Sequence, residues 1–246
     1  MVLFISPPFG NYLNFPKTIP IRGSFTLYPR KGRFRQIIKT LRYDFGYGCW
    51  INKIGLRNPG IDSAIKSWKK GEIISIAILD KSEVEMLLNK VPENMDIELN
   101  ISCPNTEHEM NRFGIEKFLN NKRDWCIIKL GPIETITTID KLYNMGFRQF
   151  HCSNTVPTKN IPNVDYDGGM SGKVLIPYTT DLVKQISEKY SDVEIIAGGG
   201  IQNIETLNQY KRLGAHHFSI SSLCFHPIKF VKFYYNWYFN DWYVVQ

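Results

Sequence analysis

The chain has 246 residues, 43% of them hydrophobic, and 30 lysines and arginines against 23 acidic residues give a formal net charge of +7. This length can form one α/β barrel or two smaller domains, and since no Pro/Gly/Ser-rich linker divides the chain, we expect a single domain over 1–246. The five cysteines are odd in number and lack metal-ligand spacing, which argues against a disulfide framework or a metal site and favours free thiols in the cytoplasm.

The positive charge raises the question of a nucleic-acid partner, because basic clusters at 30–35 and 66–70 could contact phosphates. A solvated surface is the simpler interpretation in a lysine-rich sequence, so charge alone predicts no nucleic-acid partner. The apolar residues 1–5 are too few for a signal peptide or a membrane span, and we expect no membrane anchor.

The first two predicted strands are Val2–Ser6 and Ile19–Leu27. The short segment between them contains three prolines and a glycine, which leaves no room for a crossover helix. We therefore predict that the helix between strands 1 and 2 is missing. Residues 28–60 show no helical periodicity and are rich in glycine, so we interpret them as a long irregular or hairpin insertion, of the kind that is usually functional.

Strands and helices alternate from residue 62 onward. Further strands are predicted over Glu72–Ala77, Asp96–Ile101, Trp125–Leu130, Gln149–Cys152, Glu194–Ala197 and His217–Ile220. Helices are predicted over Asp62–Lys70, Ser82–Asn89, Ile115–Asn121, Thr135–Met145, Thr179–Tyr190, Ile204–Leu213 and from Pro227, with a loop before Thr179. Eight strands joined mostly by helices predict a (β/α)₈ TIM barrel, with a doubly wound open sheet as the alternative.

One strand ends in an unusual group of side chains. In Asp96–Ile101 the apolar residues share one face, while Glu98, Asn100 and Ser102 share the other, and Cys103 and Pro104 follow. A cysteine at the carboxyl end of a barrel strand can meet a small polar ligand, although a buried thiol before a proline turn is the structural alternative. Other polar residues also fall at strand ends, where a barrel places its site: Ser6, Lys129, Asn154, Ser221 and Ser222.

Two glycine clusters, at 168–172 and 198–200, each precede a predicted helix. Backbone N–H groups without a neighbouring Cβ, next to a helix amino terminus, can bind a phosphate, although a tight turn also explains one such cluster. Because they follow strands 6 and 7, with Ser221 and Ser222 ending strand 8, they predict a barrel phosphate site.

Assembled in this order, these residues resemble the dihydroorotate dehydrogenase family, flavin enzymes of pyrimidine synthesis built on this barrel. The resemblance runs from about Ser6 to the end of the chain. Its most specific motifs are Asn-Ile-Ser-Cys-Pro-Asn at 100–105, Ile-Asn-x-x-Gly-Leu at 51–56, Ser-Asn-Thr at 153–155, Gly-Gly-Met-Ser-Gly at 168–172 and Ala-Gly-Gly-Gly-Ile at 197–201.

The resemblance implies FMN as cofactor and oxidation of dihydroorotate to orotate, with Cys103 as general base and Lys129 beside the flavin ring. Cysteine at position 103 is typical of the soluble branch, whereas the membrane-bound, quinone-using branch has serine. The residues implied to bind the pyrimidine are Asn52, Gly55, Leu56, Asn100, Asn105, Asn154 and Thr155. Those implied to bind the flavin are Ser6, Ala77, Asn100, Lys129, Gly169, Ser171, Gly172, Gly199, Gly200, Ser221 and Ser222.

The chemistry of the residue types agrees with these roles. Neutral carboxamides can donate to a carboxylate and accept from ring N–H groups without acting as bases. A thiol facing the flavin across the substrate can remove a proton while hydride leaves for flavin N5, and a lysine offsets negative charge on the reduced flavin.

The chain departs from the family pattern at one position of the second strand. A second flavin-side lysine falls at Gly23, and the adjacent Arg22 points to the opposite face of a regular strand, unless a bulge turns it inward. The alternatives are therefore a degenerate flavin-binding barrel with little turnover, and a flavoprotein similar to tRNA-dihydrouridine synthases. The sequence leaves the electron acceptor open, and both a homo-oligomer and an electron-transfer subunit stay possible as partners.

Overall fold

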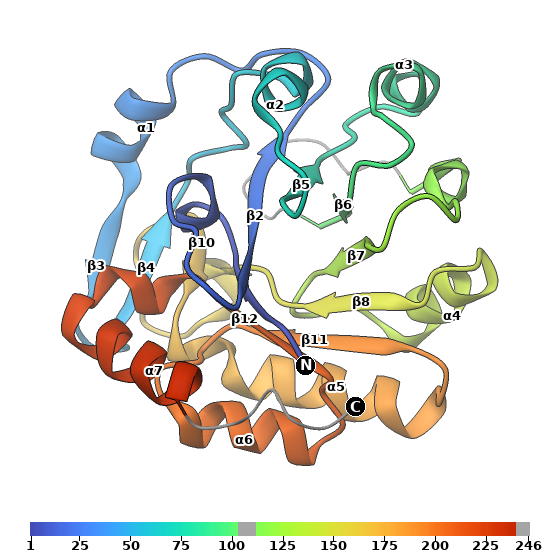
Figure 1. Cartoon of the computed structure of the whole chain (residues 1–246). Helices are drawn as coiled ribbons and strands as arrows, with labels where there is room; N and C mark the ends of the chain where they lie inside the picture. Colours follow the sequence, from blue (N-terminus) through green and yellow to red (C-terminus); the bar gives the residue numbers. More distant parts are fainter. Residues whose placement is uncertain (103–111, 240–246) are drawn as a thin grey trace.

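The computed structural model describes residues 1–102 and 112–239, and its centre is a closed barrel of eight parallel strands in the order β1-β12-β11-β8-β7-β6-β5-β2 (Figure 1). The barrel strands are β1 Leu3–Ile5, β2 Thr18–Phe25, β5 Ile73–Ile76, β6 Ile97–Asn100, β7 Cys126–Leu130, β8 Gln149–Cys152, β11 Glu194–Gly198 and β12 His217–Ile220. All eight predicted strands are thus found within two residues at each end, and the (β/α)₈ prediction is confirmed.

Helices cover the outside of the barrel, as Figure 1 shows. The α-helices are α1 Arg33–Thr40, α2 Ile61–Ser67, α3 Glu83–Lys90, α4 Ile136–Asn144, α5 Ile176–Lys189, α6 Ile204–Arg212 and α7 Pro227–Phe239. The 3₁₀ turns are η1 Phe9–Asn11, η2 Ile115–Phe118, η3 Thr158–Asn160, η4 Lys173–Leu175 and η5 Ser222–Phe225. Only η1 lies between β1 and β2, so the expected absence of a helix there is confirmed.

The strands are buried on both faces, which explains their almost continuous apolar runs. Phe4, Ile21, Ile73, Ile127 and Ile196 form one cluster near the amino-terminal ends of the strands. Alternate residues on the same strands point outward and pack under the helices in a larger core. Because the apolar cluster closes one end of the interior, polar side chains are left for the carboxyl ends of the strands.

The insertion at 28–60 contains the predicted hairpin, made of β3 Arg42–Asp44 and β4 Cys49–Asn52, but also a helix that the sequence analysis missed. The statement that this stretch lacks helical periodicity is wrong for α1, whose apolar residues Phe34, Ile37 and Ile38 follow helical spacing. No residue of α1 is fully buried. The helix therefore lacks the core-facing stripe by which buried helices are recognised.

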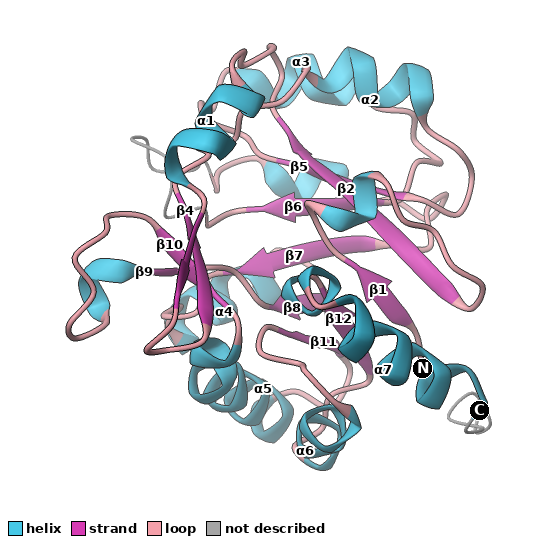
Figure 2. Cartoon of the chain, turned by 90° about the vertical axis from the view of Figure 1, so that its left-hand side faces the viewer, coloured by secondary structure: helices cyan, strands magenta, loops and turns pink. Residues whose placement is uncertain are grey.

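Two further strands were predicted as loop: β9 Val156–Pro157 and β10 Gly169–Ser171. They join the hairpin in a second sheet of order β3-β4-β10-β9, which stands beside the carboxyl ends of the barrel strands (Figure 2). The short, glycine-containing β10 has little intrinsic strand propensity, and its pairing with β4 stabilises it as a strand. Cys49, Ile51, Val156 and Met170 form a small core of their own between this sheet and Leu175.

The remaining differences concern helix ends. The helix predicted over Ile115–Asn121 is only the turn η2, because Ile115 and Phe118 are the residues that it buries and Leu119 is already extended. Helix α5 begins three residues before the predicted Thr179, with a proline in its first turn, where a missing N–H costs nothing. Helix α7 packs Phe230, Phe233 and Trp237 into the core. Among the described residues, the longest apolar helices fall short of what crossing a membrane requires.

Candidate active site at the carboxyl end of the barrel

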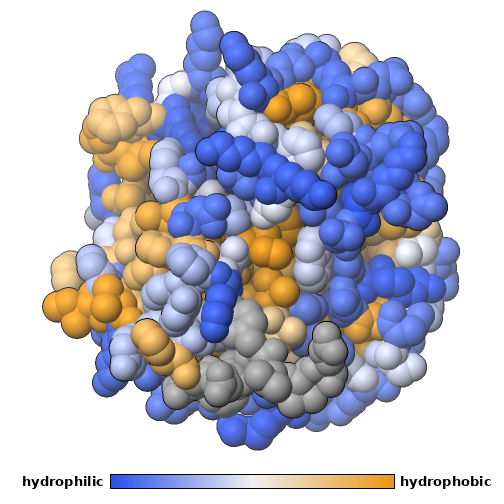
Figure 3. Space-filling model, in the orientation of Figure 1, coloured by the Kyte–Doolittle hydropathy of each residue, from blue (hydrophilic) through white to orange (hydrophobic). Residues whose placement is uncertain are grey.

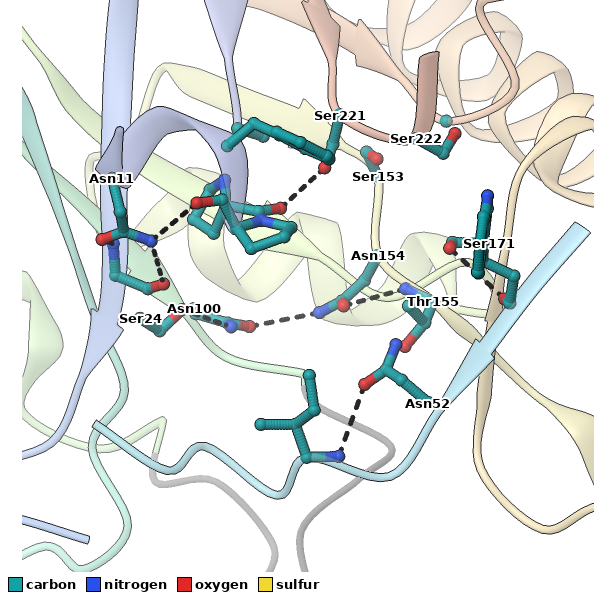
Figure 4. Close-up of a pocket in the computed structure, with 18 of the residues that line it drawn as sticks. Asn11, Ser24, Asn52, Asn100, Ser153, Asn154, Thr155, Ser171, Ser221 and Ser222 are labelled. Atoms are coloured by element: carbon teal, nitrogen blue, oxygen red, sulfur yellow. Dashed lines mark hydrogen bonds between the residues drawn. The ribbon is translucent and has the colours of Figure 1, made fainter. Parts of the chain in front are cut away.

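A cavity of about 400 Å³ lies between the carboxyl ends of the barrel strands and the second sheet. Most residues singled out in the sequence line it, and Figure 4 shows many of them around one space. The predicted site residues in its wall are Ser6, Asn52, Gly55, Leu56, Asn100, Lys129, Asn154, Thr155, Ser171, Gly172, Gly199, Gly200, Ser221 and Ser222.

Four predicted residues are not placed in this wall. Ala77 is fully buried and its N–H donates to the Phe25 carbonyl, so it belongs to the strand packing between β2 and β5. Gly169 is buried in the β4–β10 ladder opposite Asn52. Cys103 and Asn105 lie outside the described residues.

Carboxamides meet at the centre of the cavity. Asn100 Nδ2 donates to Ser24 Oγ at 2.9 Å, and Asn154 Nδ2 donates to Asn100 Oδ1 at 3.2 Å (Figure 4). Asn154 Nδ2 also donates to the carbonyl of Ser102, the residue before Cys103, and Asn154 Oδ1 accepts from Thr155 N–H at 2.9 Å. This chain of hydrogen bonds fixes the orientation of both amides, since each O/N assignment follows from its partners.

Strand β2 is irregular where the second lysine was expected. Its pairing with β5 shifts register between Arg22 and Phe25, and Gly23 has φ 127°. A Cβ at Gly23 would lie 2.5 Å from the Ser75 carbonyl oxygen, so a lysine there would require the strand to move. The irregularity instead directs Ser24 into the cavity, where its hydroxyl is 2.9 Å from that of Ser75.

The alternative that Arg22 turns inward is wrong. Its guanidinium donates to Glu72 Oε2 at 2.7 Å and to the Ser67 carbonyl at 3.0 Å, both outside the barrel. Arg22 therefore fastens α2 to the outer surface of the barrel and leaves Lys129 as the cation on the barrel strands that line the cavity.

A buried ionic network lies beneath the amides. Glu98 is fully buried, and its two carboxylate oxygens accept from Ser75 Oγ and His151 Nδ1, each at 2.7 Å. Lys129 Nζ lies 3.6 Å from Glu98 Oε1. Burial alone would favour the neutral acid, but Lys129 and these two hydrogen bonds outweigh it and lower the pKa of Glu98 to about 2. Burial lowers the pKa of His151 despite its carboxylate partner, so the ring is neutral and donates from Nδ1.

This network should make the folded protein less stable as the pH is lowered. Below pH 4.5 an unfolded chain protonates Glu98, whereas the folded protein does so only near pH 2, so the contribution is complete above 4.5 and is lost toward 2. His151, with its lowered pKa, adds a loss below pH 6.5. We expect urea unfolding to show a decrease on the order of 3 kcal/mol from Glu98 across this range. Glu98→Gln should remove the share of Glu98 from the slope below pH 4.5 and leave the share of other carboxyls with a lowered pKa, such as Glu194. A slope equal to that of the wild type would contradict the assignment.

Glycines of both predicted clusters line the cavity, and close packing is one reason for two of them. Gly199 and Gly200 have φ values of 87° and 77°, and a Cβ at Gly200 would lie 2.4 Å from Ile176 Cγ1. They lack side chains because the loop after β11 packs closely against the start of α5. Ser221 Oγ donates to the Pro7 carbonyl at 2.8 Å, and Ser222 follows it in the wall. The wall therefore combines hydroxyls and loop backbone with amides and Lys129, groups that can bind a polar ligand carrying a phosphate.

Several cavity residues were missed in the sequence. Asn11 of η1 accepts from Gly23 N–H at 3.0 Å and donates to the Pro8 carbonyl at 3.0 Å, which fixes the edge of the cavity formed by β2. Arg33 and Arg57 line the mouth, and Trp50 stacks on Phe225 with ring centroids 4.4 Å apart. Ser24 was missed as well. It is the one missed residue with a signal in the sequence, because it directly follows the unusual glycine at position 23.

Comparison with known proteins gives consistent matches. The profile of a family described as dihydroorotate dehydrogenase matches residues 17–232. The "Dihydroorotate dehydrogenase B (NAD(+)), catalytic subunit" of Thermotoga maritima is 27% identical over 251 residues, covering 92% of this chain and 91% of that protein. The "Dihydroorotate dehydrogenase (quinone)" of Coxiella burnetii is 28% identical over 200 residues, covering 64% of this chain and 57% of that protein. The structure of DHODH in complex with ferulenol from Eimeria tenella covers 93% of this chain and 77% of that one, with a TM-score of 0.68 at 16% identity, which shows the shared fold alone.

Proposed function

Because the chain belongs to the dihydroorotate dehydrogenase family, whose members are oxidoreductases acting on dihydroorotate in pyrimidine synthesis, we propose that it binds FMN in this cavity and uses Cys103 as the base. The observation that supports the proposal best is the meeting of Asn52, Asn100 and Asn154 in one cavity with Lys129. Bound FMN would supply the hydride acceptor that the protein lacks.

The amides would bind and orient the pyrimidine. Their N–H groups can donate to its carboxylate, and their carbonyl oxygens can accept from the ring N–H groups. The hydrogen bond from Asn154 to the Ser102 carbonyl ties this substrate-binding set to the backbone next to Cys103. Cys103, the proposed base, therefore directly follows Ser102, whose carbonyl accepts a hydrogen bond from Asn154 of the proposed substrate-binding set.

Lys129 would stabilise negative charge on the flavin ring system. Its side chain is mostly buried, its ammonium lies 3.6 Å from Glu98 Oε1, and it lines the cavity, whereas Glu98 does not. In a site shielded from water, a fixed ammonium of this kind stabilises developing negative charge more strongly than it does in solvent. Gly23 offers no second ammonium, so we expect slow flavin reduction. Orotate should still bind strongly, because all four asparagines of the family pattern are present in the sequence.

Ser222→Asp should weaken FMN binding on the order of tenfold or more, because a carboxylate at the proposed phosphate site would repel the phosphate and must be desolvated beside it. Ser63→Asp is the matched control, since it adds the same charge on the exposed surface of α2. Fluorescence titration of apoprotein with FMN measures both. Equal affinities in the two variants would place the phosphate elsewhere.

The function itself is tested by ligand binding to the FMN-loaded protein. Orotate should perturb the flavin absorption spectrum at saturable concentrations, because it would stack in the same cavity. Tight binding of tRNA, together with a flavin spectrum that orotate leaves unchanged, would favour a tRNA-modifying flavoprotein instead.

A further inference from the structure

Helix α1 leaves a strip of apolar side chains in solvent. Phe34 and Ile38 lie one helical turn apart and are 76% and 63% exposed. Ile37 turns the other way and lines the mouth of the cavity, so the helix packs by one edge only. Phe45, in the turn that follows β3, is 89% exposed. In Figure 3 apolar surface gathers along the left-hand edge, where Figure 1 draws α1, β3 and β4 and, below them, α7.

The sequence around α1 is also strongly basic. Residues 30–43 contain six lysines and arginines and no acidic residue, whereas residues 44–246 contain 22 basic and 23 acidic residues. Arg35 and Lys39 each follow one of the two exposed apolar residues of α1 and are themselves exposed. None of the ion pairs found among the described residues neutralises them.

We define the α1 patch as Phe34, Ile38 and Phe45 together with Arg35, Lys39 and Arg42. Alternating apolar and basic side chains on one exposed strip fit the surface of an anionic bilayer: the apolar groups enter the boundary of headgroups and acyl chains, and the basic groups reach the headgroups. An RNA partner would use the basic residues but leave Ile38 without a role. A second copy of the chain, packed through the same patch, would bring like charges together.

We propose that the α1 patch attaches the protein peripherally to membranes that carry anionic lipids. The attachment requires no membrane-spanning segment, and it places the mouth of the cavity, which Ile37 and Arg33 line, close to the bilayer surface. The inference is independent of the chemistry in the cavity, since it rests on exposed side chains and their charge.

Vesicle flotation of the full chain loaded with FMN tests the attachment. The protein should float with vesicles of phosphatidylcholine and phosphatidylglycerol in equal amounts, should stay at the bottom with phosphatidylcholine alone, and should be released by high salt. Failure to float with the anionic vesicles would overturn the proposal, and equal flotation with both kinds of vesicle would overturn its electrostatic part.

Variants decide whether the α1 patch is responsible. Phe34→Gln combined with Ile38→Gln should lower the vesicle-bound fraction on the order of tenfold, because glutamine keeps the helix but removes the apolar contact. Ile133→Gln is the matched control, since Ile133 is also exposed, at 58%, but lies just before α4. Equal loss in both, or no loss in the α1 variant, would overturn the assignment. A dimer in sedimentation that the α1 variant dissociates would assign the patch to a second copy of the chain instead.

Discussion

Cys103→Ala is expected to bind FMN normally and to slow flavin reduction by dihydroorotate by a factor on the order of 10²–10⁴, because it removes the proposed general base without filling the site. Cys103→Ser should retain a little activity that rises with pH, since a hydroxyl is harder to deprotonate than a thiol. Stopped-flow absorbance under anaerobic conditions measures both variants.

Two other cysteines provide matched controls for this substitution. Burial raises the pKa of Cys126 to about 12, and it also raises the pKa of the fully buried Cys152. Both thiols are therefore inert at neutral pH, and Cys126→Ala and Cys152→Ala should change stability but leave the reduction rate within a small factor. A Cys103→Ala variant as fast as these controls would show that position 103 is only a packing position.

Glu98→Ala is expected to destabilise the fold by about 3–5 kcal/mol, because it leaves Lys129 and His151 without their buried partner. Glu98→Gln should cost less, since a carboxamide can still bond to Ser75 and His151. The control is Asp62→Ala, which removes an exposed ion pair with Lys90 and should cost about 1 kcal/mol or less. Urea unfolding at pH 7 compares the three variants. A Glu98→Ala variant that loses no more stability than Asp62→Ala would contradict the account of the network.

The barrel could be predicted because its strands are buried on both faces. Runs such as Ile73–Ile76 and Cys126–Leu130 have too few polar residues for a surface strand, and helical segments separate them regularly. Their carboxyl ends then place Asn100, Lys129 and Asn154 at one mouth, whatever the details of the loops. This part of the candidate site therefore followed from order along the chain.

The parts that could not be predicted depend on contacts that local sequence does not contain. Helix α1 buries none of its residues fully, and β10 is a strand only because β4 pairs with it. The outward direction of Arg22 depends on Glu72 and Ser67, which are distant in sequence. Glu98 had been identified on the polar face of its strand, but only the closed barrel shows that His151 shares its carboxylate.

The most direct test is anaerobic mixing of the FMN-loaded protein with dihydroorotate while the flavin absorbance is followed. The account predicts bleaching of the flavin with formation of one orotate per flavin, at a slow rate that reflects the missing lysine at Gly23. Absorbance that stays unchanged over hours, in protein whose flavin dithionite still reduces, would contradict the proposed oxidation of dihydroorotate.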